Sequence, residues 1–176
     1  LFQVRWDDER ARIGNLLAMV TGLRAGEVVG LQIRDIGADR IHVRHSWSEE
    51  DRLKSTKTNQ ERTVPVIAVA RAELLRLVGL NPHRGGDERF VFYSSDPKRP
   101  MRVEVLLDGL KRALLRMSLN DDELKDEAKV QQARGAWKAR RVVFHSWRHF
   151  YAARMADRLD ARTVMVATGH RTASVF

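Results

Sequence analysis

The stretch His145-Ser-Trp-Arg148-His149-Phe-Tyr151 decides how the rest of the sequence is interpreted. It places two imidazoles and a guanidinium within five positions, directly after the apolar Val142–Phe144. Ser146 is a residue type that favours the N-cap, which predicts a helix from Ser146 to about Arg158. One face of that helix would be an apolar stripe made of Trp147, Phe150, Tyr151 and Met155.

Arg148 would lie in the first turn of this helix, where backbone N–H groups and the helix dipole favour an anion such as phosphate. The same pattern also fits a capped amphipathic helix with a solvated arginine. A motif of this length is therefore only a hypothesis, and its support must come from the rest of the chain.

Composition narrows the class of protein. The chain has 176 residues, 43% of them hydrophobic and 31% charged, which suits one soluble domain with its own core. A formal net charge of +9 indicates a polyanionic partner, most simply nucleic acid. The absence of cysteine excludes disulfides and thiolate metal sites. No stretch resembles a signal peptide or a membrane span.

Two helices are predicted at the start of the chain. Acidic residues Asp7–Glu9 precede a helical apolar pattern that Gly22 can end, and a short helix follows over Arg24–Leu31. Arg24 then lies at the junction of the two helices, and Glu27, three residues on, can pair with it. The alternative is an ordinary ion pair on a helix surface.

A strand section follows. Arg40–Trp47 alternates polar and apolar residues with the period of a strand. Lys54–Thr58 and Arg62–Val66 are predicted to be the arms of a hairpin that turns at Asn59–Glu61. Lys57 would stand near the tip of this hairpin, where a solvated edge lysine is the alternative to a functional one.

The remaining segments are mostly helical. Helices are predicted over 69–78 and 103–117, with Phe90–Tyr93 as an extended core segment between them. Residues 118–141 run from an acidic to a basic end and are expected to be a solvated helix or loop whose basic end contacts phosphate. His170 follows a helix ended by Gly169, where it could equally serve as a C-terminal cap. The fold class is therefore mainly α with a small antiparallel β-sheet (α+β).

Four of these segments together resemble the tyrosine recombinases, also called the phage integrase family. Thr21–Glu27, read as Thr-Gly-Leu-Arg-Ala-Gly-Glu, resembles the first catalytic box. His145-x-x-Arg148-His149 resembles the second box, and Gly169-His170 resembles the third. Lys57, ahead of Arg62-Thr-Val-Pro, is similar to the family's hairpin lysine. The order and spacing agree over nearly the whole chain.

The resemblance implies site-specific DNA recombination, in integration or excision, through a 3′-phosphotyrosine intermediate. Arg24 and Arg148 would hold the non-bridging oxygens of the scissile phosphate, a task that suits forked N–H donors. His145 would assist proton transfer from the tyrosyl hydroxyl, His170 would bond the phosphate, and Lys57 would protonate the leaving 5′-oxygen. No metal or cofactor is expected, because the arginines supply the positive charge.

Further residues are expected to assist. Glu27 and His149 are expected to support the catalytic set. The residues expected to bind DNA are Lys54, Arg62, Arg134, Lys138, Arg140, Arg141 and Arg171. The implied partners are double-stranded DNA and further copies of the chain, which would form a tetramer on DNA in the full-length protein. No membrane partner is expected, and the implied location is cytoplasmic, at the nucleoid of a prokaryote.

The sequence also departs from the family. Trp147 stands where leucine is most common, and the 118–141 segment is longer than usual. The nucleophilic tyrosine should follow His170 by nine residues, at position 179, and neither Tyr93 nor Tyr151 fits that spacing. We therefore expect residues 1–176 to be a single catalytic domain, without the family's N-terminal core-binding domain, that ends before the nucleophile and is inactive in cleavage.

Other classes of function fit parts of the pattern. A non-catalytic DNA-binding regulator derived from a recombinase would explain the charge and the missing tyrosine. A metal-independent ribonuclease could use the same histidines, lysine and arginines. A type IB topoisomerase would share the chemistry but relax DNA without recombining it.

Overall fold

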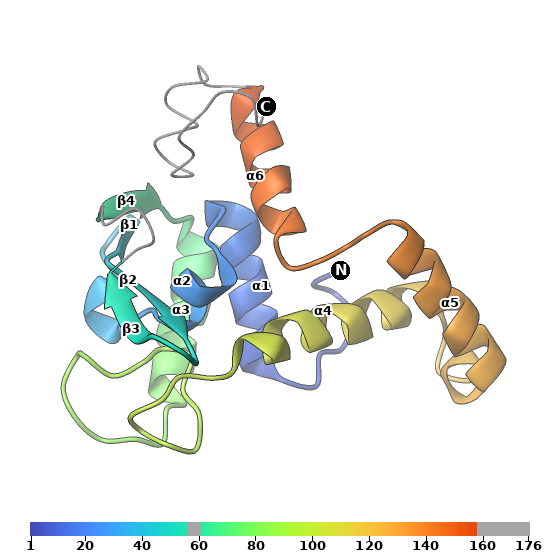
Figure 1. Cartoon of the computed structure of the whole chain (residues 1–176), viewed down its shortest axis with the longest axis horizontal. Coiled ribbons are helices and arrows are strands. Elements are labelled where there is room, and N and C mark those ends of the chain that lie inside the picture. Colours follow the sequence, from blue (N-terminus) through green and yellow to red (C-terminus); the bar gives the residue numbers. More distant parts are fainter. Residues whose placement is uncertain (56–60, 158–176) are drawn as a thin grey trace.

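The computed structural model describes residues 1–55 and 61–157 and is mainly helical (Figure 1). The helices are α1 (Glu9–Thr21), α2 (Ala25–Val29), α3 (Ala68–Gly79), α4 (Val103–Ser118), α5 (Glu127–Ala139) and α6 (Ser146–Ala156). The strands are β1 (Arg40–Val43), β2 (His45–Ser48), β3 (Arg52–Ser55) and β4 (Arg62–Pro65). The predicted fold class is confirmed. Over the described ranges no helix is long and apolar enough to cross a bilayer.

Helix α1 is the centre of the domain, and it contacts α2, α3, α4 and α6 (Figure 1). Asp8 caps it by accepting from the backbone N–H of Arg10 at 2.8 Å. Gly14 allows α4 to come close, because a Cβ there would lie 2.4 Å from Leu106 Cδ2. Gly22 ends the helix with a φ of 67°, in the left-handed region that favours glycine.

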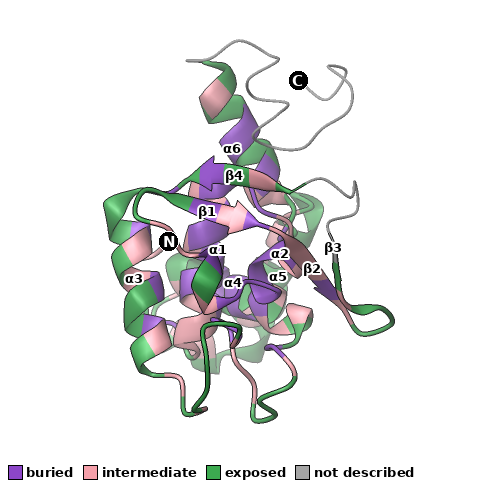
Figure 2. Cartoon of the chain, turned by 90° about the vertical axis from the view of Figure 1, so that its left-hand side faces the viewer, coloured by how far each residue is buried: buried purple, intermediate pink, exposed green. Residues whose placement is uncertain are grey.

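The core lies between α1, α3, α4 and the strands, where Figure 2 shows buried residues in purple. The core residues come from segments far apart in the sequence. The helices that line the core turn their opposite faces to solvent, as Figure 2 shows for α3. The fully buried side chains include Leu17, Val28, Ile41, Leu74, Phe92 and Leu106.

The strands form two separate antiparallel pairs. β1 pairs with β4, with Ile41 opposite Val64, and β2 pairs with β3, with Trp47 opposite Leu53. The prediction of a small antiparallel sheet over 40–66 is confirmed, but the predicted pairing of the two hairpin arms is wrong for the described parts. Lys54 and Ser55 pair with β2, and Arg62–Pro65 pair with β1, because Val64 and Trp47 both bury apolar side chains in the core there.

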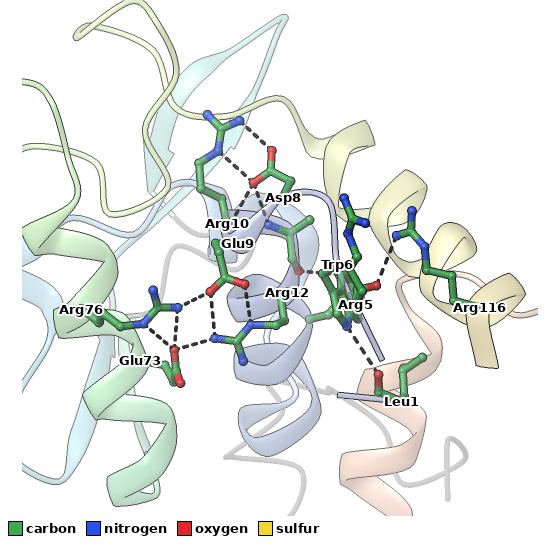
Figure 3. Close-up of polar contacts among 12 residues, drawn as sticks. Leu1, Arg5, Trp6, Asp8, Glu9, Arg10, Arg12, Glu73, Arg76 and Arg116 are labelled. Atoms are coloured by element: carbon green, nitrogen blue, oxygen red, sulfur yellow. Dashed lines mark hydrogen bonds and ion pairs between the residues drawn. The ribbon is translucent and has the colours of Figure 1, made fainter. Parts of the chain in front are cut away.

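A network of ion pairs joins α1 to α3 (Figure 3). Arg12 of α1 contacts Glu73 of α3 at 2.6 Å, and it also contacts Glu9 at 3.0 Å. Arg76 of α3 contacts both Glu9 and Glu73. Each pair is partly exposed, so each adds little alone. Because Arg12 and Arg76 share both glutamates, the network as a whole constrains the angle between α1 and α3.

The predicted helix limits are close, but some faces differ. The apolar pattern of the predicted helix over 103–117 would turn Met117 inward, but Met117 is 48% exposed and Leu115 is buried instead. Ser146 is not the N-cap of α6: His145 takes that position, and the Ser146 hydroxyl accepts from the backbone N–H of Val143 at 3.1 Å. Phe150 is also 47% exposed, so the apolar stripe expected on α6 is incomplete.

The long segment before α6 forms an arm. Helix α5 begins at an Asp126 cap, has no buried residue, and extends away from the rest of the domain (Figure 1). The prediction of a solvated helix here is confirmed. The arm turns back toward α6 at Arg141, whose φ is 53°.

Candidate active site

Arg24 stands at the N-cap of α2, in an extended conformation that the αL turn at Gly22 leads into. Its backbone N–H donates to Glu27 Oε2 at 2.9 Å, and its Nη1 donates to Glu27 Oε1 at 3.1 Å. The predicted pairing of Arg24 with Glu27 is therefore present. The Glu27 side chain is only 2% exposed, so this pair is no ordinary surface ion pair.

Arg62 of β4 joins the same carboxylate. Its Nη1 donates to Glu27 Oε1 at 3.0 Å, and its Nη2 donates to Glu27 Oε2 at 2.7 Å. Burial opposes the charge of Glu27, but the hydrogen bonds and charges of Arg62 and Arg24 outweigh it, and they hold the pKa of Glu27 below its ordinary value. Glu27 is thus an anion buried between two cations.

Arg148 lies in the first turn of α6 and is 1% exposed. Its Nη1 donates to the carbonyl of Gly22 at 2.9 Å, at the C-terminal end of α1 where the helix dipole favours a cation. Burial and the positive charge of Arg24 lower the pKa of Arg148 to about 10, while Glu27 acts in the opposite direction. Arg148 therefore remains charged at neutral pH, and it lies near enough to Arg24 for the two charges to interact.

His145 stands at the N-cap of α6, one turn before His149. The two rings meet edge to face, with centroids 5.0 Å apart. Although the residue is largely exposed, loss of hydration around its ring lowers the pKa of His145, and its electrostatic interactions with His149, Arg148 and Arg24 lower it further. His145 is consequently neutral at physiological pH and able to accept a proton.

The structure brings Arg24, His145 and Arg148 together with Glu27, from the N-terminal ends of two helices. Their predicted catalytic roles remain predictions. Three predicted residues lie outside the described residues: Lys57, His170 and Arg171.

The predicted DNA-binding residues divide into two groups. Arg62 points inward onto Glu27, whereas the others within the described ranges are exposed. Lys54 of β3 forms an ion pair with Asp51, which precedes the strand. The guanidinium carbon of Arg140 lies 5.0 Å from the centroid of the Trp137 ring. The exposed basic residues at the end of the arm are Arg134, Lys138, Arg140 and Arg141.

Three of these four residues, Arg134, Lys138 and Arg141, also line a groove of about 660 Å³ between α4 and α5. The floor of the groove is mainly apolar, with Trp137 and Val143 among its members. The groove is therefore separate from the cluster around Glu27.

Two residues that support the site were missed at the level of sequence. Asn15 is fully buried on α1, where its amide donates to the carbonyl of Leu106 on α4 at 2.9 Å. Its Oδ1 accepts from Trp147 Nε1 on α6 at 2.7 Å. The signal was a polar residue on the apolar face of α1, next to Ile13 and Leu17. Gly22, noted only as a helix end, also supplies the carbonyl that binds Arg148.

Comparisons with known proteins give the family and the fold of the chain. Residues 5–175 match the phage integrase family. The chain belongs to the phage integrase family. A probable integrase/recombinase protein of Methanocaldococcus jannaschii is 33% identical over 130 residues, which cover 73% of this chain and 32% of that protein.

Solved structures show the same fold. The Tn1549 transposon integrase in complex with transposon right end DNA matches 98% of this phage integrase family chain with a TM-score of 0.70 and 18% identity. The XerA recombinase matches 95% of it with a TM-score of 0.62 and 19% identity. A lambda integrase dimer bound to a core site matches 97% of it with a TM-score of 0.56 and 16% identity.

The chain is shorter than these relatives. It spans about a third of the archaeal protein. It spans 55% of the Tn1549 integrase chain and 50% of the XerA recombinase chain.

Proposed function

We propose that this domain is the catalytic part of a protein that cuts and rejoins DNA at specific sites, in integration or excision. The observation that carries the proposal is the pair of arginines, Arg24 and Arg148, at the N-terminal ends of two helices, which lie near enough to interact with each other and with the buried carboxylate of Glu27. Family membership supports the reaction class. The DNA-bound relatives, one of them a dimer, support double-stranded DNA and further copies of the chain as partners.

The proposed chemistry is a transesterification at a DNA phosphate. A tyrosyl oxygen attacks phosphorus and loses its proton, while the bond to the 5′-oxygen breaks and that oxygen gains a proton. Negative charge develops on the non-bridging oxygens. Arg24 and Arg148 are proposed to hold these oxygens, because guanidinium groups offer forked N–H donors.

The remaining roles rest on the motif resemblance. His145 is proposed to assist removal of the tyrosyl proton, because its lowered pKa keeps the ring in the neutral form that can accept one. Lys57 is proposed to protonate the 5′-oxygen, and His170 to bond the phosphate. The tyrosine itself is proposed to come from the complete protein, at the family's spacing from His170.

The test uses the complete protein and an end-labelled, nicked suicide substrate. We expect a 3′-linked covalent adduct on a denaturing gel, formed in the presence of chelator. Arg148→Lys keeps the charge but loses the fork, so it should slow adduct formation by about 10²–10³-fold, the usual effect of losing one charge-stabilising donor. Arg154→Lys, on the exposed side of the same helix, is the matched control and should leave the rate unchanged.

Two outcomes would reject the proposal. Tight DNA binding without any adduct would favour a non-catalytic regulator. Cleavage of RNA, lost when its 2′-hydroxyls are methylated, would favour a ribonuclease.

A further inference from the structure

Arg62 carries a basic side chain on a strand next to the proposed site, where a contact to DNA phosphate would be the simplest role. Its guanidinium is instead turned into the protein. It forks both oxygens of Glu27 at 3.0 and 2.7 Å, and its side chain is 10% exposed. A planar, two-bond arrangement of this kind fixes the orientation of a carboxylate as well as its charge.

Glu27 is fully occupied as a result. Its Oε1 accepts from Arg24 Nη1 and Arg62 Nη1, and its Oε2 accepts from the Arg24 backbone N–H and Arg62 Nη2. A carboxylate offers about four lone-pair sites, so these four bonds use them all. Because Arg62 takes one site on each oxygen, the guanidinium of Arg24 contacts Glu27 end-on, through Nη1.

The end-on contact matters for the proposed reaction. A guanidinium that shares both oxygens of one carboxylate presents its fork to that carboxylate and not to a phosphate. The Glu27 carboxylate remains next to Arg24, because it is buried and a buried charge must stay paired. Without Arg62, the Glu27 carboxylate is expected to rotate and accept two parallel hydrogen bonds from the Arg24 guanidinium.

The strand holds Arg62 in place for this role. β4 pairs with β1 so that Arg62 lies opposite Val43, and the next residue but one, Val64, is completely buried. The backbone of Arg62 is therefore fixed by the sheet, and its side chain reaches α2 from a rigid support.

We infer that Arg62 is a positioning residue, which holds the Glu27 carboxylate so that Arg24 presents its guanidinium fork to the scissile phosphate. This inference rests on the proposed function. It differs from a direct DNA contact in a measurable way, since a phosphate contact releases counterions on binding and a buried positioning residue does not.

The experiment measures two quantities on the complete protein: the single-turnover rate of adduct formation at saturating DNA, and the dependence of DNA affinity on salt. Arg62→Lys keeps the charge and loses the fork, and we expect its rate to fall about 10–100-fold. The slope of log affinity against log salt should stay as in the unaltered protein. A lost phosphate contact would instead change that slope by about 0.9, the change expected for Lys54→Gln if Lys54 binds phosphate.

Two controls separate positioning from general damage to the fold. Arg12→Lys alters another forked arginine–glutamate pair, between Arg12 and Glu9, far along α1 from the site, and should leave the rate unchanged. Glu27→Gln should itself be slow, and adding Arg62→Lys to it should cost much less than Arg62→Lys alone, because the two residues act as one unit.

The outcomes distinguish this inference from the proposed function. If the unaltered protein forms no adduct, the proposed function fails. If it forms the adduct and Arg62→Lys reacts at the same rate, or if Arg62→Gln lowers the salt slope, the inference on Arg62 is overturned while the proposed function stands. Additive effects of Arg62→Lys and Glu27→Gln would overturn it as well.

Discussion

Arg148 holds a positive charge at a position with almost no access to water, and two features offset the cost of burying it. The carbonyl of Gly22 accepts one of its N–H groups at the end of α1, where the dipole is negative. The anionic Glu27 attracts it, while Arg24 repels it. A DNA phosphate placed between Arg24 and Arg148 would remove that repulsion, so the site is built to gain from an anion.

The same positive field acts on His145, which predicts a specific pH response. Its folded-state pKa lies below the ordinary value of 6.5, so folded protein resists protonation more than unfolded protein does. The contribution of His145 to stability is therefore complete above pH 6.5 and is lost as the pH falls toward the folded pKa. His149→Gln removes one repelling group and should raise the pKa of His145, as measured by NMR titration of its ring protons.

Inorganic sulfate gives a second test of how the nearby positive charges act on the pKa of His145. An anion bound near Arg24 and Arg148 should also raise the pKa of His145, whereas the ring-proton signals of His83, which bonds the carbonyl of Ser94 elsewhere in the fold, should not respond to sulfate. A His145 titration midpoint at or above 6.5 in the unaltered protein would contradict this account.

At the scale of elements, one buried amide connects three helices. Asn15 bonds α4 through Leu106 and α6 through Trp147, and it also donates to the carbonyl of Ala11 in its own helix at 2.8 Å. Trp147→Leu, which introduces the residue most common in the family, removes the donor to Asn15 Oδ1. We expect it to lower the free energy of unfolding by about 1–3 kcal/mol, the cost of an unsatisfied buried acceptor.

The matched control is another tryptophan whose ring nitrogen bonds a side chain. Trp137 Nε1 donates to Ser118 Oγ at 3.0 Å on the exposed arm, so Trp137→Leu should cost much less. Chemical denaturation of both variants measures the difference. Equal losses of unfolding free energy in the two variants would show that the hydrogen bond from Trp147 to Asn15 adds no more stability than the exposed one. Asn15→Leu together with Trp147→Leu should recover part of the loss, because no polar group is then left unsatisfied.

The elements themselves were largely predictable, because helix caps and apolar periods are local signals. The limits of α1, α3 and α4 follow from Asp8, Gly22 and the apolar spacing. Strand pairing was not predictable, since it depends on which core positions Val64 and Trp47 reach. Motif order predicted that Arg24, His145 and Arg148 belong together, and the structure brings them together, while their roles stay predictions. The inward turn of Arg62 was missed, because a sequence does not show which carboxylate a basic side chain faces.

At the scale of the whole molecule, the basic residues that the motifs and the arm single out lie in two places. Arg24 and Arg62 pair with the buried Glu27, and Arg148 is buried near them, while the basic end of α5 is exposed on an arm. The arm connects to α6 through a turn that ends at His145. We interpret the arm as a second contact with DNA, one that would add affinity without touching the scissile phosphate.

The last prediction concerns covalent capture of DNA by the 176-residue chain itself. It contains two tyrosines, and neither is placed to attack a phosphate. Tyr93 has its ring under the Arg10 guanidinium, 5.4 Å from it, and its backbone carbonyl accepts from the same group. Tyr151 is 3% exposed beneath Gly22, and burial raises the pKa of its hydroxyl, which makes it a poorer nucleophile at neutral pH.

The chain should therefore bind duplex DNA in a salt-dependent way, as its net charge of +9 favours, yet form no adduct with a suicide substrate. Polarising a phosphate cannot replace the attacking oxygen, so added Mg²⁺ should not change the result. The protein made from its complete coding sequence should give the adduct under the same conditions. A covalent band from the 176-residue chain that disappears in Tyr151→Phe would overturn this prediction, because it would require α6 to move and expose a side chain that now packs against the end of α1.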